Sequence, residues 1–458
     1  MMKISSIPFR EYDIRGIVDE QLDETLVEQI GRALGTMLVA KGQPSLFVAR
    51  DGRLSGPKLV TALKKGLLST GCDVIDIGQV PTPLLYFAVN NYPTKSGVVL
   101  TGSHNPANYN GLKIAVDGKT LSGQAIRDLY QAVCDGKFAQ GQGRESTQDI
   151  VSDYIERVCN DVKLSRPLKL VIDSGHGIAG AVAPALYRRL GCEVVELYCD
   201  VDGHFPHHHP DPGCPENLQD LIKKVAEVQA DIGLAFDGDA DRLGVITDTG
   251  TIIWPDRQLV LFALDVLKRQ PGAEIIYDVK STYHLDAIIK KAGGKPTMWK
   301  TGHSLIKQKL IDSGAALAGE LSGHIFFKER WYGFDDGLYA GARLLEILAQ
   351  SDQSISALFA DIPDSVNTPE LKIQVSEQQK QPLMRKILEC FHPPGAERVT
   401  IDGLRLVFKN GWGLIRPSNT TACLTLRFEA DNADHLAEIQ TIFRQQLLAI
   451  QPDLSLPF

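Results

Sequence analysis

The sequence has few cysteines for its length and no closely spaced pair of them. Eight cysteines are spread over 458 residues, and no C-x-x-C pair occurs among them. Small secreted scaffolds and structural zinc sites both depend on clustered cysteines, so neither class of protein is indicated. We expect reduced, mostly buried thiols in a cytoplasmic protein.

Long apolar runs and an excess of basic residues are also missing. No run approaches the roughly 18 apolar residues of a membrane-spanning helix, and the first ten residues contain no apolar signal core. The formal net charge is −8, whereas nucleic-acid-binding proteins present a basic surface. The sequence therefore predicts no membrane and no nucleic-acid partner, but it allows a local positive pocket for a small anion.

What the sequence does contain is an alternation of strand-like and helix-like segments, which is typical of mixed, largely parallel sheets covered by helices. Apolar strand-like runs are predicted at 46–50, 72–78, 96–101, 168–173, 192–198, 231–236 and 274–278. Helices are predicted at 57–68, 178–190, 215–230, 256–269, 302–312 and 335–350.

The chain is long enough for three or four domains of about 100–150 residues each. The alternation restarts twice, so we predict three α/β domains of similar architecture at 1–148, 149–251 and 252–363. A polar stretch then leads into short strands, a hairpin at 404–414 and a helix at 433–449. These predict a smaller α+β domain at 364–458, and the four domains are expected to surround a central cleft.

A hydroxyl stands at the end of the strand-like run 96–101. The loop that follows reads Thr-Gly-Ser-His-Asn-Pro over residues 101–106, with Ser103 at its centre. Open α/β sheets keep their ligands at such strand ends, so Ser103 is a candidate nucleophile. Lys113, ten residues further on, is placed to neutralise a charged Ser103 or to move a proton.

Three carboxylates follow the run 231–236 in the sequence Asp-Gly-Asp-Ala-Asp-Arg, residues 237–242. In an extended chain Asp237, Asp239 and Asp241 would fall on one side and would repel one another without a cation. Hard oxygen ligands select Mg²⁺ or Ca²⁺. An EF-hand loop is excluded because Arg242 replaces its turn glycine and because strands flank the loop.

Two further loops between predicted strands offer groups that suit a sugar and a phosphate. Residues 319–324, Gly-Glu-Leu-Ser-Gly-His, supply a carboxylate for polyol hydroxyls and glycines that permit close approach. Residues 416–421, Arg-Pro-Ser-Asn-Thr-Thr, supply a guanidinium and hydroxyls for a phosphate. Tyr12 and Arg15 are placed to face an anionic substrate, and Lys280 and His303 each follow a strand-like run.

Two histidine-containing segments are interpreted as turns and not as metal-binding or phosphate-binding sites. His207–His209 lies between two prolines, and adjacent histidines cannot all face one metal, so we interpret it as a structural or solvated turn. Residues 174–177, Ser-Gly-His-Gly, lack the full glycine pattern of a phosphate loop and predict a tight turn from strand to helix.

Taken together, the four loops resemble those of the α-D-phosphohexomutase superfamily, in the same order and across the whole chain. Residues 300–306 and 326–331 resemble, more narrowly, bacterial phosphomannomutase/phosphoglucomutase. Ala240 and Ala422 depart from the residues that the family often has there, but neither departure removes a ligand.

The resemblance implies roles for individual residues. Ser103 would carry a phosphoryl group and, with the three aspartates, bind one Mg²⁺. The implied catalytic residues are Ser103, His104, Lys113 and Arg15, and the implied metal ligands are Ser103, Asp237, Asp239 and Asp241. The implied substrate contacts are Tyr12, Arg15, Arg242, Lys280, His303, Glu320, Leu321, Ser322, Gly323, His324, Arg416, Pro417, Ser418, Asn419 and Thr420. Whether Lys113, His303 or His324 moves the proton stays open.

The implied reaction is reversible phosphoryl transfer between C1 and C6 of mannose and glucose phosphates. It would pass through a phosphoserine and a hexose 1,6-bisphosphate, which also serves as activator. The alternatives are a phosphoglucosamine mutase and a metal-assisted serine phosphatase; an acyl hydrolase is not indicated because no G-x-S-x-G surrounds Ser103. We expect small hexose phosphates as partners and a monomer or weak dimer.

Overall fold

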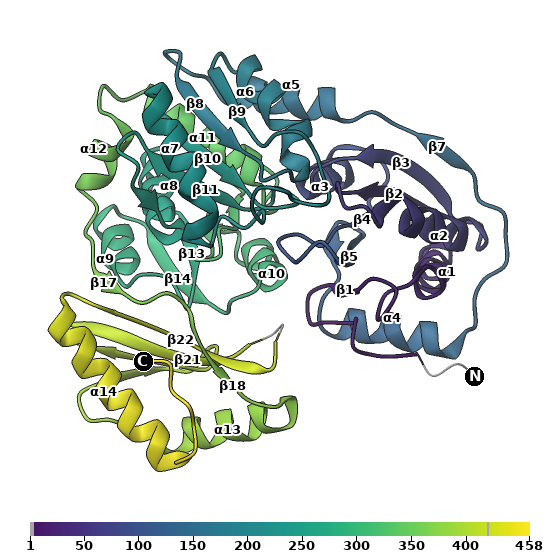
Figure 1. Ribbon diagram of the computed structural model, residues 1–458. Helices are drawn as coiled ribbons and strands as arrows, with labels where there is room; N and C mark the ends of the chain where they lie inside the picture. Colours follow the sequence, from purple (N-terminus) through teal and green to yellow (C-terminus); the bar gives the residue numbers. More distant parts are fainter. Residues whose placement is uncertain (1–3, 419–420) are drawn as a thin grey trace.

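The computed structural model describes residues 4–418 and 421–458, which form four sheets in succession along the chain. We call the parts built on these sheets the first to fourth units. Figure 1 shows the first three covered by helices and the fourth, in yellow and light green, beside the third. Within the described ranges, no helix is both long and apolar enough to cross a membrane.

The first unit has a seven-stranded sheet in the order β1-β5-β4-β2-β3-β7, with β6 paired to β5. Its strands are β1 (Ile14–Ile17), β2 (Ser45–Arg50), β3 (Asp73–Gln79), β4 (Gly97–Leu100), β5 (Tyr109–Val116), β6 (Lys119–Thr120) and β7 (Glu145–Thr147). Its helices are α1 (Glu24–Ala40), α2 (Gly56–Leu68), α3 (Thr82–Asn91) and α4 (Gln124–Asp135).

The second unit has five strands in the order β12-β11-β10-β8-β9. They are β8 (Lys169–Asp173), β9 (Glu193–Leu197), β10 (Ile232–Phe236), β11 (Leu243–Thr247) and β12 (Ile252–Ile253). The helices are α5 (Val151–Asp161), the 3₁₀ helix η1 (Ile178–Ala181), α6 (Ala183–Arg189), the 3₁₀ helix η2 (Pro215–Leu218) and α7 (Gln219–Val228).

The third unit has four strands in the order β14-β13-β15-β16. They are β13 (Glu274–Asp278), β14 (Lys295–Trp299), β15 (Leu317–Gly319) and β16 (Ile325–Phe327). The helices are α8 (Pro255–Arg269), α9 (His284–Lys291), α10 (His303–Ser313), α11 (Gly337–Ala349) and α12 (Ile355–Ala360).

The fourth unit is antiparallel throughout, in the order β17-β22-β21-β20-β19 with β18 paired to β22. Its strands are β17 (Val366–Asn367), β18 (Leu371–Gln374), β19 (Glu397–Val399), β20 (Leu404–Phe408), β21 (Gly411–Pro417) and β22 (Cys423–Ala430). Its helices are α13 (Glu377–Cys390) and α14 (Ala433–Ile450).

The first three units share one topology. Each contains four strands that follow one another along the chain. The first of these four is central and pairs in parallel with the second on one side and with the third on the other. The fourth strand pairs antiparallel with the third. These sets are β2-β3-β4-β5, β8-β9-β10-β11 and β13-β14-β15-β16. The predicted class of three similar α/β domains and a smaller α+β domain is confirmed.

One large apolar cluster runs through the first three units, each of which also has a smaller cluster of its own, and the fourth unit has a separate core. The largest cluster of buried side chains includes Phe47, Leu234 and Phe262. A separate cluster in the fourth unit is built around Phe428 and Phe443. The fourth unit therefore joins the others mainly through polar contacts and a small apolar patch.

Several element boundaries differ from those predicted. The segment predicted as one helix at 178–190 is divided into η1 and α6, because Pro184 has no N–H to continue a helix through that point. The predicted helix at 335–350 begins at Gly337, because the Asp336 side chain accepts a hydrogen bond from the backbone N–H of Tyr339 and caps the helix there.

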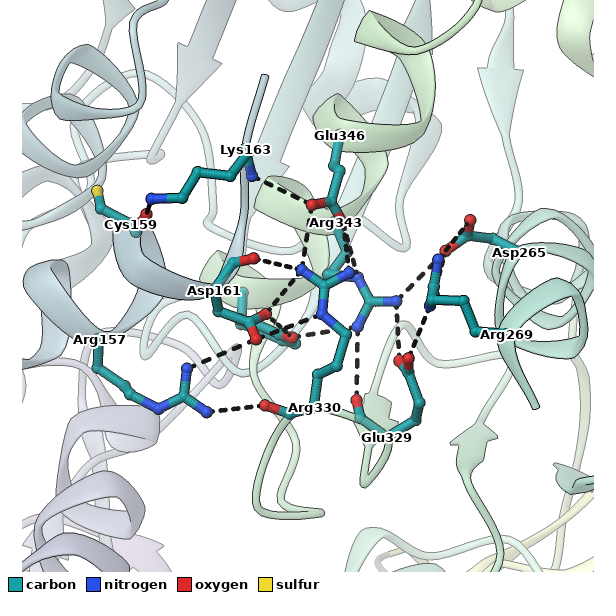
Figure 2. A network of polar contacts seen from close by, with 11 residues as sticks. Arg157, Cys159, Asp161, Lys163, Asp265, Arg269, Glu329, Arg330, Arg343 and Glu346 are labelled. Carbon is teal, nitrogen blue, oxygen red and sulfur yellow. Dashed lines mark hydrogen bonds and ion pairs between the residues drawn. The ribbon is translucent and has the colours of Figure 1, made fainter. Parts of the chain in front are cut away.

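A buried ionic network ties α5 of the second unit to the third (Figure 2). Arg343 on α11 has no exposed side-chain surface and donates to Glu329 at 3.0 Å and Asp265 at 3.3 Å. Arg330 pairs with Asp161 of α5 at 3.1 Å and with Glu346 at 2.8 Å. Since charges this deeply buried need partners, the network constrains how the two units meet.

Replacing Arg343 should destabilise the protein strongly. In Arg343→Met, the buried carboxylates of Glu329 and Asp265 lose a counter-charge, and removing one partner of a buried ion pair costs about 3–5 kcal/mol. We expect a melting temperature lower by several degrees in scanning calorimetry.

The matched control is Arg188→Met, which removes an ion pair to Glu196 whose members are 51% and 41% exposed. Exposed pairs contribute little, so this variant should melt close to the wild type. Equal melting temperatures for Arg343→Met and Arg188→Met would contradict a stabilising role for the network.

Candidate active site

The loop between β4 and β5 holds Ser103 in an unusual backbone conformation. Ser103 has φ 48°, in the left-handed region that side chains rarely adopt. Its N–H donates to the Thr101 hydroxyl at 2.9 Å, and its hydroxyl donates to the Asp237 carboxylate at 2.7 Å. The hydroxyl also lies 3.1 Å from His104 Nδ1. The loop thus directs the Ser103 hydroxyl toward the aspartate loop of the second unit.

The aspartate loop connects β10 to β11. In the topology that the units share, it occupies the same position as the Ser103 loop between β4 and β5. It is turned and not extended, because Ala240 has φ 62° and its N–H donates to the Asp237 carbonyl at 3.1 Å. The turn still brings Asp237, Asp239 and Asp241 together, with one carboxylate oxygen from each within 4.8 Å of the others. All three are fully buried.

The charges of this loop are partly balanced by Lys113 on β5. Its ammonium lies 2.6 Å from Asp239 Oδ2 and 2.5 Å from Asp241 Oδ2. Burial opposes the charged lysine, but the two aspartates outweigh it and raise the pKa of Lys113 well above its ordinary value. Lys113 therefore stays protonated and acts as a counter-charge.

The same loop retains unpaired oxygen atoms that suit a hard divalent cation. Burial and repulsion from Asp241 and Asp239 raise the pKa of Asp237. Asp239 Oδ1 and Asp241 Oδ1 are buried and have no hydrogen-bond partner in the part of the chain that the structure describes. Lys113 and Arg242, whose Nε lies 3.8 Å from Asp237 Oδ2, supply two positive charges against three carboxylates, so the donor set fits a hard divalent cation.

The loop between β15 and β16, in the third unit, carries Glu320 and His324. Hydrogen bonds from Glu320 N to His324 O at 2.9 Å and from Gly323 N to Glu320 O at 3.0 Å close it into a turn. The Glu320 carboxylate accepts from the N–H of Gly302 at 2.5 Å. His324 Nε2 accepts from Arg242 at 3.1 Å, which links this loop to the aspartate loop.

Arg416 lies near the end of β21 in the fourth unit, just before the loop to β22. Its Nε donates to Asp402 at 2.9 Å, whereas its Nη2 is buried and has no hydrogen-bond partner among residues 4–418 and 421–458. Lys380 donates to the carbonyl oxygens of Ser418 at 2.9 Å and Thr421 at 3.1 Å and so anchors the loop. The predicted phosphate ligands Asn419 and Thr420 lie outside the described residues.

These loops border one cleft of about 460 Å³ to which all four units contribute. The predicted residues that line it are Tyr12, Arg15, His104, Arg242, Lys280, His303, Glu320, Ser322, His324, Arg416 and Ser418. Ser103, Lys113 and the three aspartates are buried and are not among the described residues that line it; Ser103 contacts the lining residue His104, and Lys113 contacts Asp239. Leu321 and Gly323 of the β15–β16 loop and Pro417 at the end of β21 are not among the described residues that line the cleft.

Cations dominate the lining. Arg15 donates to Asn105 at 2.6 Å and pairs with Asp13 at 2.5 Å. Burial opposes the charged form of Lys280, but Glu370, whose carboxylate lies 3.2 Å away, raises the pKa of this lysine. An anionic ligand would therefore find fixed positive charge within the cleft.

Two histidines that line the cleft, His104 and His303, are held neutral. Burial and the charge of Arg242 lower the pKa of His104, and burial and the charge of Lys307 lower the pKa of His303, well below the ordinary value for histidine. The Tyr12 ring lies edge-on to His303, with the centroids 5.9 Å apart, and the Tyr12 hydroxyl donates to the Thr301 carbonyl at 3.1 Å. An imidazole held neutral in this way can accept a proton.

Among the site residues that were not predicted, four make polar contacts with predicted ones. Thr82 donates to Asp239 at 2.6 Å, and Asp335 pairs with His324 at 3.2 Å. Glu370 and Asp402 pair with Lys280 and Arg416. None of them stands in a motif, so only the three-dimensional contacts reveal them.

Comparison with known proteins agrees with this arrangement. Models of the phosphoglucomutase/phosphomannomutase α/β/α domains I, II and III match residues 6–140, 152–250 and 254–366, and the C-terminal domain model matches residues 370–446. A phosphomannomutase/phosphoglucomutase of Pseudomonas putida is 54% identical over 98% of this chain and 97% of its own. A phosphoglucomutase of Neisseria meningitidis is 50% identical over all of both chains.

Among solved structures, a phosphoglucomutase/phosphomannomutase family protein from Burkholderia thailandensis superposes with a TM-score of 0.95. It is 52% identical, and the match covers 99% of this chain and 100% of that one. With four family domains in sequence and relatives of this identity over the full length, the chain belongs to the phosphoglucomutase/phosphomannomutase family.

Proposed function

We propose that this chain is a hexose-phosphate mutase that interconverts the 1-phosphates and 6-phosphates of mannose and glucose. The observation that carries the proposal is the contact between the Ser103 hydroxyl and Asp237, 2.7 Å apart, beside the cleft that Arg416 also lines. A phosphate carrier, a cation site and a phosphate ligand thereby border a space that fits a sugar phosphate. We expect a cytoplasmic enzyme that acts as a monomer or weak dimer.

Asp237, Asp239 and Asp241, with phosphorylated Ser103, would hold Mg²⁺. When bound, the ion supplies positive charge that offsets the negative charge of the transferring phosphoryl group.

In the first half of the cycle, a substrate hydroxyl oxygen attacks the phosphorus of phosphorylated Ser103. The bond from phosphorus to Ser103 Oγ breaks, and a hexose 1,6-bisphosphate forms. A base takes the proton of the attacking hydroxyl. Because Lys113 is held charged by two aspartates, whereas His303 is neutral and lines the cleft, we assign the proton to a histidine.

In the second half, the bisphosphate turns end for end within the cleft, and Ser103 Oγ attacks the phosphorus of its other phosphoryl group. The bond from that phosphorus to the sugar oxygen breaks, and the base returns its proton to this oxygen, which becomes the product hydroxyl. Arg416 contacts whichever phosphate lies distal to Ser103. Glu320 and Ser322 would hold the hydroxyls at C3 and C4, which nearly exchange places on turning. A trace of hexose 1,6-bisphosphate serves as activator because it can phosphorylate any unmodified Ser103.

The direct test is turnover of glucose 1-phosphate to glucose 6-phosphate with Mg²⁺ and trace glucose 1,6-bisphosphate, together with the intact mass of the protein. The wild type should be active, and a fraction should carry one phosphate at Ser103. Ser103→Ala should lose essentially all turnover and the added mass, since the carrier hydroxyl is gone.

Ser146→Ala on β7, where the side chain is exposed, is the matched control and should behave as wild type. Release of inorganic phosphate in step with substrate loss would instead indicate a phosphatase. Full turnover by Ser103→Ala would contradict the phosphoserine cycle.

The sugar preference can be measured directly. Glucose and mannose differ only at C2, and Glu320 and Ser322 are assigned to C3 and C4, so kcat/KM for the two 1-phosphates should be similar. Glucosamine 1-phosphate should react more slowly, because the cleft lining is rich in cations that oppose an ammonium group. A clear preference for glucosamine 1-phosphate would contradict this assignment.

Arg416→Lys should weaken substrate binding. Lysine cannot form two parallel hydrogen bonds to a phosphate, and a hydrogen bond to a charged group contributes about 1.5–3 kcal/mol. We expect KM to rise by roughly tenfold or more on that basis, with a smaller change in kcat. Arg385→Lys, exposed on α13 of the same unit, is the control; an unchanged KM for Arg416→Lys would contradict its role as a phosphate ligand.

A further inference from the structure

A fully buried arginine lies under the Ser103 loop and makes no contact that the reaction above requires. Arg53 stands in the turn between β2 and α2 and is 1% exposed. We propose that Arg53 is a positioning residue that holds the Ser103 loop in its left-handed conformation. This inference deepens the proposed function and depends on it only for the catalytic consequence.

The guanidinium of Arg53 donates four hydrogen bonds to backbone carbonyls of a single loop. Its Nη2 donates to Ser103 at 2.8 Å and to Asn105 at 2.5 Å. Its Nη1 donates to Pro106 at 2.6 Å and to Tyr109 at 2.9 Å. These bonds use all four Nη hydrogens, so Arg53 has none left for a phosphate and acts through the loop.

The loop needs such a cation for two reasons. Its four carbonyl dipoles converge on one buried place, where they would repel one another without a donor. In addition, Ser103 has φ 48°, a conformation that persists only where the surroundings impose it. Because Arg53 binds the carbonyl of Ser103 itself, it fixes the peptide group that follows the strained residue.

Asp51 couples the arginine to the residue on the other side of Ser103. Its carboxylate lies 3.3 Å from Arg53 Nε and accepts from the N–H of Gly102 at 3.2 Å. Gly102 leaves room for the guanidinium, since a Cβ there would lie 2.4 Å from Arg53 Cζ. The Ser103 loop is thus held on both sides of Ser103, at the carbonyl of Ser103 itself and at the N–H of Gly102 before it.

The second unit covers the opposite side of this arginine. The Phe205 ring lies over the guanidinium, 5.4 Å from Cζ to the centroid. His209, in the predicted histidine turn, contacts the carbonyl of His104 through Nε2. The turn therefore has a structural use: it closes the second unit over the loop whose hydroxyl faces Asp237.

The experiment compares crystal structures and kinetics of full-length Arg53→Met and Arg53→Lys. In Arg53→Met the Ser103 loop should lose its left-handed φ, and the hydroxyl should move away from Asp237. Misplacing a reacting group by about 1 Å can cost roughly 100-fold in rate, so kcat should fall by a factor of that order while KM changes little. Arg53→Lys should recover only part of the rate, because an ammonium cannot serve four acceptors in a plane.

Arg127→Met on α4, where the arginine is 59% exposed, is the control and should retain wild-type kcat. If Arg53→Met does not fold, Phe205→Leu tests the same support: kcat should fall several-fold at unchanged KM and with a folded protein by circular dichroism. An unmoved Ser103 loop in Arg53→Met, or wild-type kcat in folded Arg53→Met or Phe205→Leu, would overturn the proposal. Inactivity of the wild type would overturn the proposed function instead, while the loop structure of Arg53→Met would still decide the positioning role.

Discussion

The mutual repulsion of three buried aspartates is the constraint around which the units assemble. Asp237, Asp239 and Asp241 stand on one loop of the second unit, and their shortest contacts are with groups of the first. Lys113 reaches in from β5, and the Ser103 hydroxyl reaches in from the β4–β5 loop. Because unmatched buried carboxylates are costly, the two units can meet closely only where these partners face the loop. Charge balance thus sets the geometry of the transfer site.

The shared topology explains why the functional loops converge. In the first three units the loops of interest join the third strand to the antiparallel fourth, and in the fourth unit the loop joins two antiparallel strands. Because the loops of the first three units occupy the same place in each unit, they all face the cleft when the units are arranged around it. The turn that follows the central strand lies nearby in two of these units. In the first unit it contains Arg53, which binds the Ser103 loop, and in the third it contains Lys280, which lines the cleft.

Local sequence predicted the loops well, because strand, turn and ligand residues are contiguous in each. It failed where a contact or a backbone angle is decided by distant parts of the chain. Thr82 and Asp335 come from other elements than the loops they contact, and the left-handed Ala240 turns an aspartate loop that was expected to be extended. The long helix α1 has no counterpart among the predicted elements, although its buried Val27, Ile30, Leu34 and Leu38 follow a helical period.

The separate core of the fourth unit has a consequence for how the protein can vary. Its apolar cluster is self-contained, and it meets the third unit through Trp412 and Leu414 against Val279 and through Arg405, which donates to the carbonyls of Val279 and Ser281. One cluster of buried side chains spans the first three units, so a change of volume within that cluster is felt by all three, although each of them also has a cluster of its own. The fourth unit is therefore the part that could be exchanged between related chains with the least repacking, whereas exchange of any of the other three would disturb the cluster that they share.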